Sequence, residues 1–287
     1  MRTMFKDLWS ALCQTFVAWS DHEGPRLGAA LAFYTILSLA PFVIFVIAIV
    51  ALVVGHSNAQ SQITSQVQGL IGPAGANAVR TVIEQAQKPT SGTFASIIGV
   101  VTLLFGASGV AGELRSALNK IWDVKTEVGG GVAGSLKDRF FSLGIVLAIG
   151  FLLLVSLMLS AALAALAAFF GGFLPMPVFL LTSIDFIVSF VGISVLFALI
   201  FKYVPTTQIA WKNVWTGAVV TAFLFTVGKS LIGLYLGTAS VGTAYGAAGS
   251  LIVVTVWVYY SAMIFYFGAE FTHVHAHRQT KTKPRRQ

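Results

Sequence analysis

The segment "FLFTVGKSLIGLYLG", residues 223–237, is apolar enough to cross a membrane apart from one charged residue, Lys229. A charged side chain near the centre of a bilayer costs about 2.5 to 3.5 kcal/mol on the mildest scale. Such residues are retained where they face neighbouring helices or a water-filled cavity. The segment therefore predicts a membrane-spanning helix with a polar interior beside it.

The whole chain has the composition of a membrane protein. Of its 287 residues, 56% are apolar and 10% are charged, whereas an average soluble domain is about 25% charged. A helical span needs about 20 mostly apolar residues, and six stretches qualify: 27–54, 94–112, 140–170, 178–201, 213–237 and 245–270. The predicted fold class is an all-α polytopic membrane protein, with six transmembrane helices in a single integral membrane domain over residues 1–287.

The distribution of Lys and Arg predicts the orientation, because basic residues concentrate on the cytoplasmic side. With both termini inside, 15 of the 18 basic residues fall in cytoplasmic segments. Only Arg80 and Lys88 fall in outer segments, and Lys229 is left within a span. We therefore expect a multi-pass protein whose two termini are cytoplasmic.

Three segments outside the spans also carry patterns. Residues 4–19 place apolar side chains on one helical stripe, which predicts an interfacial amphipathic helix: Phe5, Leu8, Trp9, Leu12, Cys13 and Phe16. The outer loop over residues 56–92 has apolar spacings that predict two short helices. Residues 271–287 form a basic tail, which suits anionic lipid headgroups or simply marks the cytoplasmic side.

The residues around Lys229 divide between two sides of the predicted helix. At 100° per residue, one side holds Lys229 with Ala222, Thr226, Gly233 and Gly237. The opposite side is larger and apolar: Val220, Leu224, Val227, Leu231 and Leu234. Small residues let helices approach closely, so we expect Lys229 to face the bundle. The alternative is that its amine extends to the outer interface.

A buried ammonium group needs a partner or water. Asp185, about seven residues into the span over 178–201, lies at a similar predicted depth to Lys229. The two side chains either form a static pair or hold water or an anionic ligand between them. Further candidates for a polar interior are Tyr34, Ser38, Thr226 and Tyr259.

Charges also recur where spans meet the predicted cytoplasmic side. Arg26 precedes the first span, Glu113 and Arg115 follow the second, and Glu270 ends the sixth. Opposite charges at a similar depth predict either a network that closes this end of the bundle or ordinary interfacial charges.

The sequence predicts no enzyme site, metal site or cofactor. Metal-assisted hydrolysis needs clustered carboxylates or histidines, whereas the ten acidic residues are scattered. Glu270, His273 and His277 share a helical face, but this pattern more often marks the end of a span. The chain also lacks the basic surface interleaved with aromatic residues that favours single-stranded RNA, so we expect no nucleic-acid partner.

Four blocks together resemble the YihY/BrkB family of bacterial inner-membrane proteins. They are "RLGAALAFYTILSLAP", "LFGASGVAGELRSALNKIWDV", "YVPTTQIAWKNVWTGAVVTAFLFTVGKSLIGLYLG" and "YGAAGSLIVVTVWVYYSAMIFYFGAEFTHVHA". The resemblance covers the chain from about Asp21 to His275. It implies six spans in the bacterial inner membrane, a virulence association, and a legacy label as ribonuclease BN.

The leading functional hypothesis is transport or redistribution of an anionic lipid or another envelope component. The expected partners are membrane lipids, including anionic phospholipid or a lipid A precursor, a second copy of the chain, or envelope proteins. No ATP-binding P-loop is present, so active transport would use an ion gradient or a partner protein. The alternatives are a structural or scaffolding membrane protein and a ribonuclease.

Overall fold

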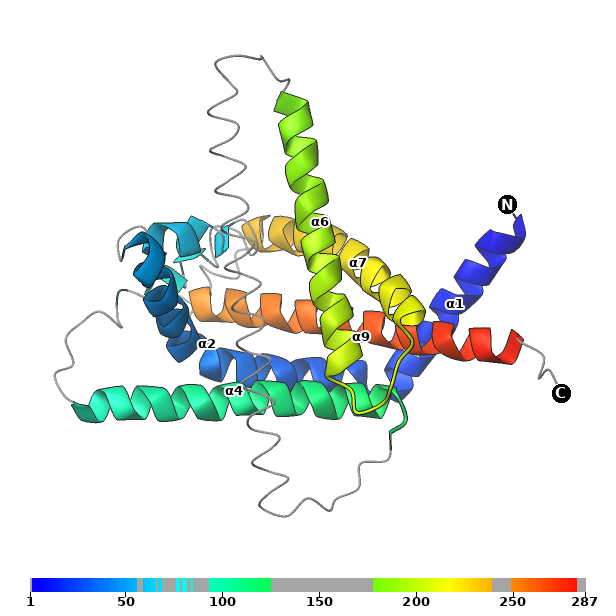
Figure 1. Cartoon of the computed structure of the whole chain (residues 1–287), viewed down its shortest axis with the longest axis horizontal. Coiled ribbons are helices and arrows are strands. Elements are labelled where there is room, and N and C mark those ends of the chain that lie inside the picture. Colours follow the sequence, from blue (N-terminus) through cyan, green and yellow to red (C-terminus); the bar gives the residue numbers. More distant parts are fainter. Residues whose placement is uncertain are drawn as a thin grey trace.

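A computed structural model describes residues 2–55, 93–124, 178–238 and 249–282, with shorter pieces at 59–65, 67–68, 76–77, 79–81 and 84. All regular structure in these residues is helical (Figure 1). The main helices are α1 (Arg2–Asp21), α2 (Gly24–Val54), α4 (Thr93–Ile121), α6 (Val178–Tyr203), α7 (Trp211–Thr238) and α9 (Gly249–Thr282). The all-α prediction is confirmed for this part of the chain.

Helices α2, α4, α6, α7 and α9 coincide closely with predicted apolar stretches. Trp211–Tyr235 and Leu251–Arg278 are long and apolar enough to cross a membrane, and Ser189–Tyr203 is a shorter apolar helix. The expected span over 140–170 lies outside the described residues. The six-span arrangement and its orientation therefore stay predictions.

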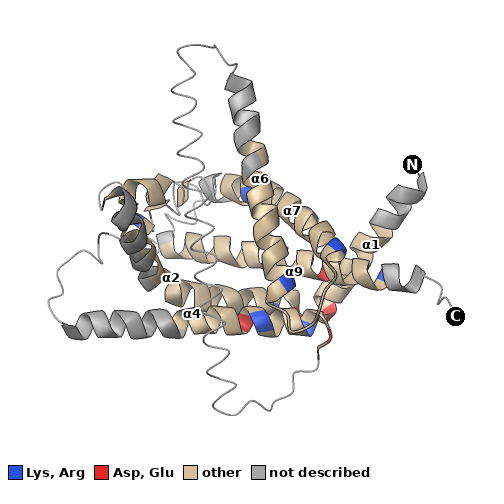
Figure 2. Cartoon of the chain, in the orientation of Figure 1, with Lys and Arg blue, Asp and Glu red and all other residues tan. Residues whose placement is uncertain are grey.

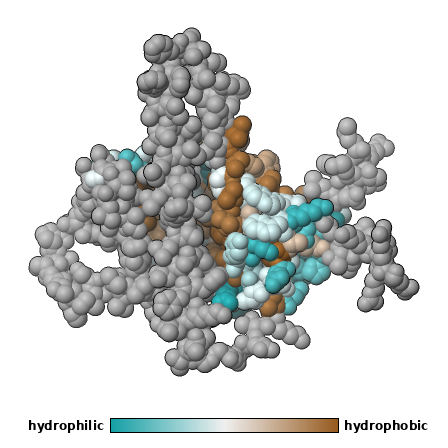
Figure 3. Space-filling model, viewed as in Figure 1, coloured by the Kyte–Doolittle hydropathy of each residue, from teal (hydrophilic) through white to brown (hydrophobic). Residues whose placement is uncertain are grey.

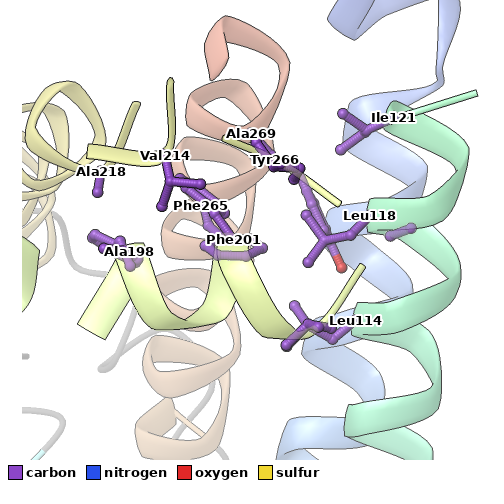
Figure 4. Close-up of a cluster of buried hydrophobic side chains, with 14 of the residues drawn as sticks. Leu114, Leu118, Ile121, Ala198, Phe201, Val214, Ala218, Phe265, Tyr266 and Ala269 are labelled. Atoms are coloured by element: carbon purple, nitrogen blue, oxygen red, sulfur yellow. The ribbon is translucent and has the colours of Figure 1, made fainter. Parts of the chain in front are cut away.

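Helix α9 is the centre of the assembly, because it contacts α1, α2, α4 and α7. Helix α4 packs beside α2, and α6 crosses α7 (Figure 1). The main apolar core lies where α4, α6, α7 and α9 meet, and Figure 4 shows Leu118, Phe201, Val214 and Phe265 converging there. Burial of such side chains contributes roughly 1.5 to 3 kcal/mol each in soluble proteins; within a membrane, packing contacts stabilise the same arrangement.

Helices α7 and α9 approach most closely at two glycines. A Cβ atom on Gly217 would collide with the side chain of Thr272, and one on Gly268 would collide with Thr221. Each threonine hydroxyl donates within its own helix, from Thr221 to the Gly217 carbonyl at 2.7 Å and from Thr272 to the Gly268 carbonyl at 2.8 Å. We call these four residues the Gly–Thr contact. It packs two helices tightly without a hydrogen bond between its threonine hydroxyls and the facing helix.

Helices α2 and α4 use the same kind of approach. The position of a Cβ on Gly106 is occupied by Ser38, and that of a Cβ on Gly109 is occupied by Tyr34. Small residues at a membrane-helix interface permit such close packing. The glycines of α4 therefore explain where Tyr34 and Ser38 lie.

The last helix is longer than the sequence predicts. α9 continues to Thr282, past the expected end at residue 270, and Phe271 and Thr272 are buried. The polar sequence after residue 272 gives no apolar run, but α1 packs along this part of α9. Residues 271–282 are thus a helical extension, and residues 283–287 of the predicted tail lie outside the described part.

Helix α1 forms where the amphipathic pattern predicts it. Ala11 and Thr15 are buried, whereas Trp9 and Phe16 are 63% and 59% exposed. These two aromatic residues of the predicted apolar stripe are therefore exposed, as expected for a helix at an interface. The side chains of Phe5 and Leu8 lie outside the described residues.

The described charges gather toward the end that carries both chain termini (Figure 2). The visible surface of the described residues changes in the same direction from apolar to hydrophilic (Figure 3). We call this the terminal end of the molecule.

Candidate functional site

A pocket of about 300 Å³ lies at the terminal end. Residues from α1, from the turn after it, from the end of α4 and from α9 line it: Gln14, Ala18, Asp21, His22, Asp123, His273, Val274, His277 and Arg278. We call it the terminal pocket. Its lining is rich in imidazole and carboxylate groups, which makes it the best candidate site among the described residues.

Two helix ends shape this region with unusual backbone. Glu23, after α1, has φ 59°, and Asp123, after α4, has φ 51°. At the end of α4, Val124 N donates to Asn119 O at 2.9 Å, the long hydrogen bond of a Schellman C-cap, where glycine is the usual left-handed residue. Asp tolerates this conformation better than most residues. The chain therefore places a carboxylate at a position that normally carries no side chain.

Glu270 is the most deeply buried charged residue of the site. Its side chain is 0% exposed, and its Oε1 atom lies 2.5 Å from Nδ1 of His22. Its other oxygen, Oε2, has no hydrogen-bond partner and lies 3.9 Å from Nδ1 of His273. A buried carboxylate with one unsatisfied oxygen is energetically costly, which marks Glu270 as a residue kept for a specific role.

The two histidines also approach a second carboxylate. Nε2 of His22 lies 3.7 Å from Asp123 Oδ1, and Nε2 of His273 lies 3.8 Å from Asp123 Oδ2. The Asp123 side chain is 71% exposed. Two imidazoles thus lie between an exposed and a buried carboxylate. We call Asp123, His22, His273 and Glu270 the carboxylate–imidazole cluster.

Neighbouring groups hold this cluster in place. The Trp122 ring packs against the His273 ring with centroids 5.0 Å apart. Arg278 donates to Gln14 Oε1 at 2.9 Å and to Ser10 Oγ at 3.1 Å, which ties α9 to α1. These contacts fix the walls of the terminal pocket.

An exposed ion-pair group lies beside the pocket. Glu23 accepts hydrogen bonds from Lys120 at 2.9 Å and from Arg26 at 2.9 and 3.0 Å. These bonds, with the charges of the same two residues, lower the pKa of Glu23 below its ordinary value of 4.5. The group joins the start of α2 to the end of α4.

The predicted cytoplasmic network involves partners that the sequence did not suggest. Arg26 pairs with Glu23 and is near enough to Glu113 for their charges to interact. Glu270 pairs with His22, and Arg115 is half-buried on α4. All four predicted residues belong to described helices, but a single network among them stays a prediction.

Lys229 lies at the edge of the packed side of α7. It is half-buried, as is Thr226, whose hydroxyl donates to the Ala222 carbonyl at 2.8 Å. On the opposite side, Leu231 and Leu234 are 58% and 67% exposed. In the described part of the chain, no carboxylate pairs with Lys229. The side chain of Asp185 lies outside the described residues, so its pairing with Lys229 stays untested.

The other interior candidates pack against glycines. Tyr34 and Ser38 face Gly109 and Gly106 of α4, and the Tyr259 ring would lie 3.5 Å from a Cβ on Gly28 of α2. Tyr34 and Tyr259 are half-buried and Ser38 is buried. The surroundings of these residues are those of close helix packing.

Sequence reasoning missed His22 and Asp123. His22 is 248 positions from Glu270 and lies in a short turn without a motif. Asp123 follows a helix end that resembles any interfacial boundary. The spacing of Glu270 and His273 was noticed, but nothing in the sequence signals the residues that face them.

The residues suggested as a weak metal set are arranged differently. Within the described ranges, no group of three or more His, Cys, Asp or Glu side chains is suited to hold a metal ion. Glu270 is paired with His22, while His277 Nδ1 lies 3.2 Å from the His273 carbonyl oxygen. This geometry gives no support to metal-assisted hydrolysis at this helix end.

The family model described as Virulence factor BrkB matches residues 15–287. The chain belongs to the BrkB family. This match confirms the resemblance noted from the four sequence blocks. It covers α7, α9 and every residue of the terminal pocket except Gln14.

Several curated relatives of this BrkB-family chain carry names that describe membrane proteins. A UPF0761 membrane protein of Verminephrobacter eiseniae is 30% identical over 88% of the chain and 58% of that relative. The UPF0761 membrane protein MS0032 of Mannheimia succiniciproducens is 25% identical over 90% of the chain and 87% of the relative. The "Putative ribonuclease-like protein YfkH" of Bacillus subtilis is 26% identical over 91% of the chain and 93% of the relative.

No solved structure matches the model of this BrkB-family chain. Its family, its relatives and its two membrane-length helices together identify it as a membrane protein of the BrkB family.

Proposed function

We propose that this chain is a multi-pass protein of the bacterial inner membrane, with both termini in the cytoplasm, that moves or redistributes an anionic lipid or another anionic envelope component. The observation that carries the proposal is the position of Lys229. It is half-buried within the membrane-length segment Trp211–Tyr235, between a packed side and an apolar exposed side.

The cost of that position argues for a ligand. An ammonium group within a span costs at least about 2.5 kcal/mol, and an anionic headgroup would offset this cost through charge-assisted hydrogen bonds. A residue at the edge between bundle and lipid can be reached by a lipid from the side. A phosphate-bearing lipid therefore fits Lys229 better than a sealed structural pair does.

The test is lipid movement between leaflets in vesicles that contain the purified protein. Fluorescent anionic phospholipid is placed in both leaflets, and dithionite added outside reports how fast the inner pool becomes accessible. We expect wild-type vesicles to exchange lipid faster than protein-free vesicles, and Lys229→Ala to slow exchange by about tenfold or more, the equivalent of one charge-assisted hydrogen bond.

Lys212→Ala is the matched control, since Lys212 is an exposed lysine at the start of the same helix. This variant should exchange lipid as fast as the wild type. Equal rates for wild-type and protein-free vesicles, across several anionic lipids, would reject the proposal.

A scaffolding role is the second candidate. It is favoured by Tyr34, Ser38 and Tyr259, which all pack against glycines of neighbouring helices. In a scaffold these polar residues only stabilise the bundle. The Lys229→Met variant would then function normally, and the amount of oligomer or partner protein recovered with it would change.

A further inference from the structure

The carboxylate–imidazole cluster has the parts of a proton path. Asp123 is exposed beside the terminal pocket, and Glu270 is fully buried behind it. Each of the two histidines has one ring nitrogen toward Asp123 and the other toward Glu270. An imidazole can accept a proton on one nitrogen and release one from the other, and Asp, Glu and His chains at membrane helices mark proton relays.

We propose that Glu270 is a proton-binding site that is filled from the terminal pocket through His22 and His273, and that this proton is the coupling ion for the movement of the anionic ligand. The coupling part rests on the proposed function, whereas the proton-binding part does not.

The transfer through His22 is balanced. A proton from water in the pocket, or from Asp123, binds Nε2 of His22 and forms an imidazolium. The proton on Nδ1 then passes over the 2.5 Å contact to Oε1 of Glu270. The carboxylate becomes a neutral carboxylic acid, and His22 is left neutral with its proton on Nε2.

His273 gives a second route to the other oxygen. Its Nδ1 atom is 3.9 Å from Oε2 of Glu270, and neither ring nitrogen has a hydrogen-bond partner. Hydrogen bonds to oxygen form at about 2.7 to 3.2 Å, so a shift of about 1 Å would close this contact. The unpartnered Oε2 is the atom that can accept this proton.

A further buried polar group lies on α9 near the cluster. Tyr266 lies one turn before Glu270 on α9, is 0% exposed, and has a hydroxyl without a partner. Figure 4 shows that the hydroxyl points toward α4 near Leu118. Glu113 of α4 is near enough to interact electrostatically with Tyr266. The buried polar atoms thus extend from the pocket into the space between α9 and α4.

Glu270 faces His22 and His273, and Asp123 faces both histidines. The elements that carry these residues, and the helices beside them, also hold other charged or titratable groups. They include Asp21 and Glu23 around the turn after α1, Arg26 of α2, Glu113 and Lys120 of α4, Lys212 of α7, and His275, His277 and Arg278 of α9.

Infrared spectroscopy of the purified full-length protein in vesicles tests proton binding directly, without a transport assay. A protonated carboxyl group in an apolar site has a carbonyl stretching band that a carboxylate lacks. We expect lowering the pH to produce such a band in the wild type, and Glu270→Gln to remove it. Glu23→Gln, which changes an exposed carboxylate at the same end, should keep it.

The relay is tested in protein that retains Glu270. In the double variant His22→Gln, His273→Gln, the shift of this band after transfer to deuterated water should be at least about tenfold slower, because general acid–base groups have been removed. If Glu270→Gln does not fold, Glu270→Asp replaces it, and its band should appear at a different frequency. A band that is unchanged in these Glu270 variants, or absent in the folded wild type at every pH, overturns the inference.

Coupling between proton binding and lipid movement is tested by repeating the lipid assay with and without a pH difference across the vesicle membrane. We expect the gradient to change the rate in the wild type and not in Glu270→Gln. A Glu270 band without lipid movement would reject the proposed function and leave proton binding intact. Lipid movement without the band would reject proton binding at Glu270 and leave the proposed function intact.

Discussion

The Gly–Thr contact and the terminal pocket both bury polar side chains of α9, but they differ in how these side chains are satisfied. In the Gly–Thr contact, both threonine hydroxyls bond to a carbonyl of their own helix. In the carboxylate–imidazole cluster at the pocket, Glu270 Oε2 and both ring nitrogens of His273 have no partner. The difference separates polar residues that serve packing from polar residues that are available for chemistry.

The comparison also shows why burial alone identifies no site. Thr221, Thr272 and Glu270 are all 0% exposed. Of these three residues, only Glu270 is ionisable and has a buried acceptor atom without a partner. Such an atom costs free energy unless it is paired or hydrogen-bonded. A buried carboxylate with an unsatisfied oxygen, rather than burial of a polar residue, distinguishes the carboxylate–imidazole cluster.

The largest effect should come from removing a partner of the buried carboxylate. His22→Ala leaves Glu270 without its 2.5 Å contact, and leaving a buried acceptor unsatisfied costs about 1 to 3 kcal/mol, and more when the group is charged. Chemical unfolding in detergent measures this loss. His22→Gln retains a donor and should recover part of it. Equal stability of His22→Ala and wild type would show that the pair contributes nothing.

The next effect concerns the Gly–Thr contact. Gly217→Ala places a methyl group where Thr272 lies, and such overpacking costs about 1 to 3 kcal/mol. Thermal unfolding in detergent should show a lower midpoint. Gly233→Ala, on the same helix, adds its methyl group in open space and should be neutral or slightly stabilising. If both variants behave alike, the close approach of α7 and α9 is not what stabilises this region.

A smaller effect tests whether the contact is purely steric. In the double variant Gly217→Ala, Thr272→Ala, the colliding hydroxyl and methyl are gone, so the combined loss should be less than the sum of the single losses by about 1 kcal/mol. A double-mutant cycle of unfolding free energies measures this coupling. Simple additivity would mean that the two residues do not touch.

The smallest effect is expected at the exposed rim of the pocket. Lys120 and Arg26 lower the pKa of Glu23, so its pairing stabilises the fold above the ordinary pKa and loses this contribution as the pH falls through the lowered value. Wild type should be slightly more stable to unfolding than Glu23→Gln at pH 7, and this difference in stability should disappear at acidic pH. A gap that widens in acid would contradict the assigned ion pair.

The long apolar helices were predictable from the sequence, because a membrane span requires a long apolar run. Apolar runs of about 20 residues mark spans without any knowledge of tertiary contacts, and helices α2, α4, α6, α7 and α9 coincide with such runs. The extension of α9 to Thr282 was missed, because its helix depends on packing against α1 rather than on apolar length.

The candidate site was predictable only in part, for a related reason. Periodicity predicted that Lys229 lies on the small-residue side of α7 and faces the bundle, and in the structure it is half-buried. The exposure of Leu231 and Leu234 agrees with the predicted apolar side. The pairing of His22 with Glu270 depends on a fold that brings together residues 248 positions apart. No local pattern records such a contact.

Because neither threonine hydroxyl of the Gly–Thr contact is committed to the opposite helix, α7 and α9 can slide or part there without breaking a hydrogen bond of that contact. The energy of separation at this point is that of van der Waals packing, which is lost gradually and regained on closing. Shear between packed helices is a common mode of conformational change. The Gly–Thr contact therefore holds the two membrane-length helices of the described bundle together by packing and not by hydrogen bonds of its threonines.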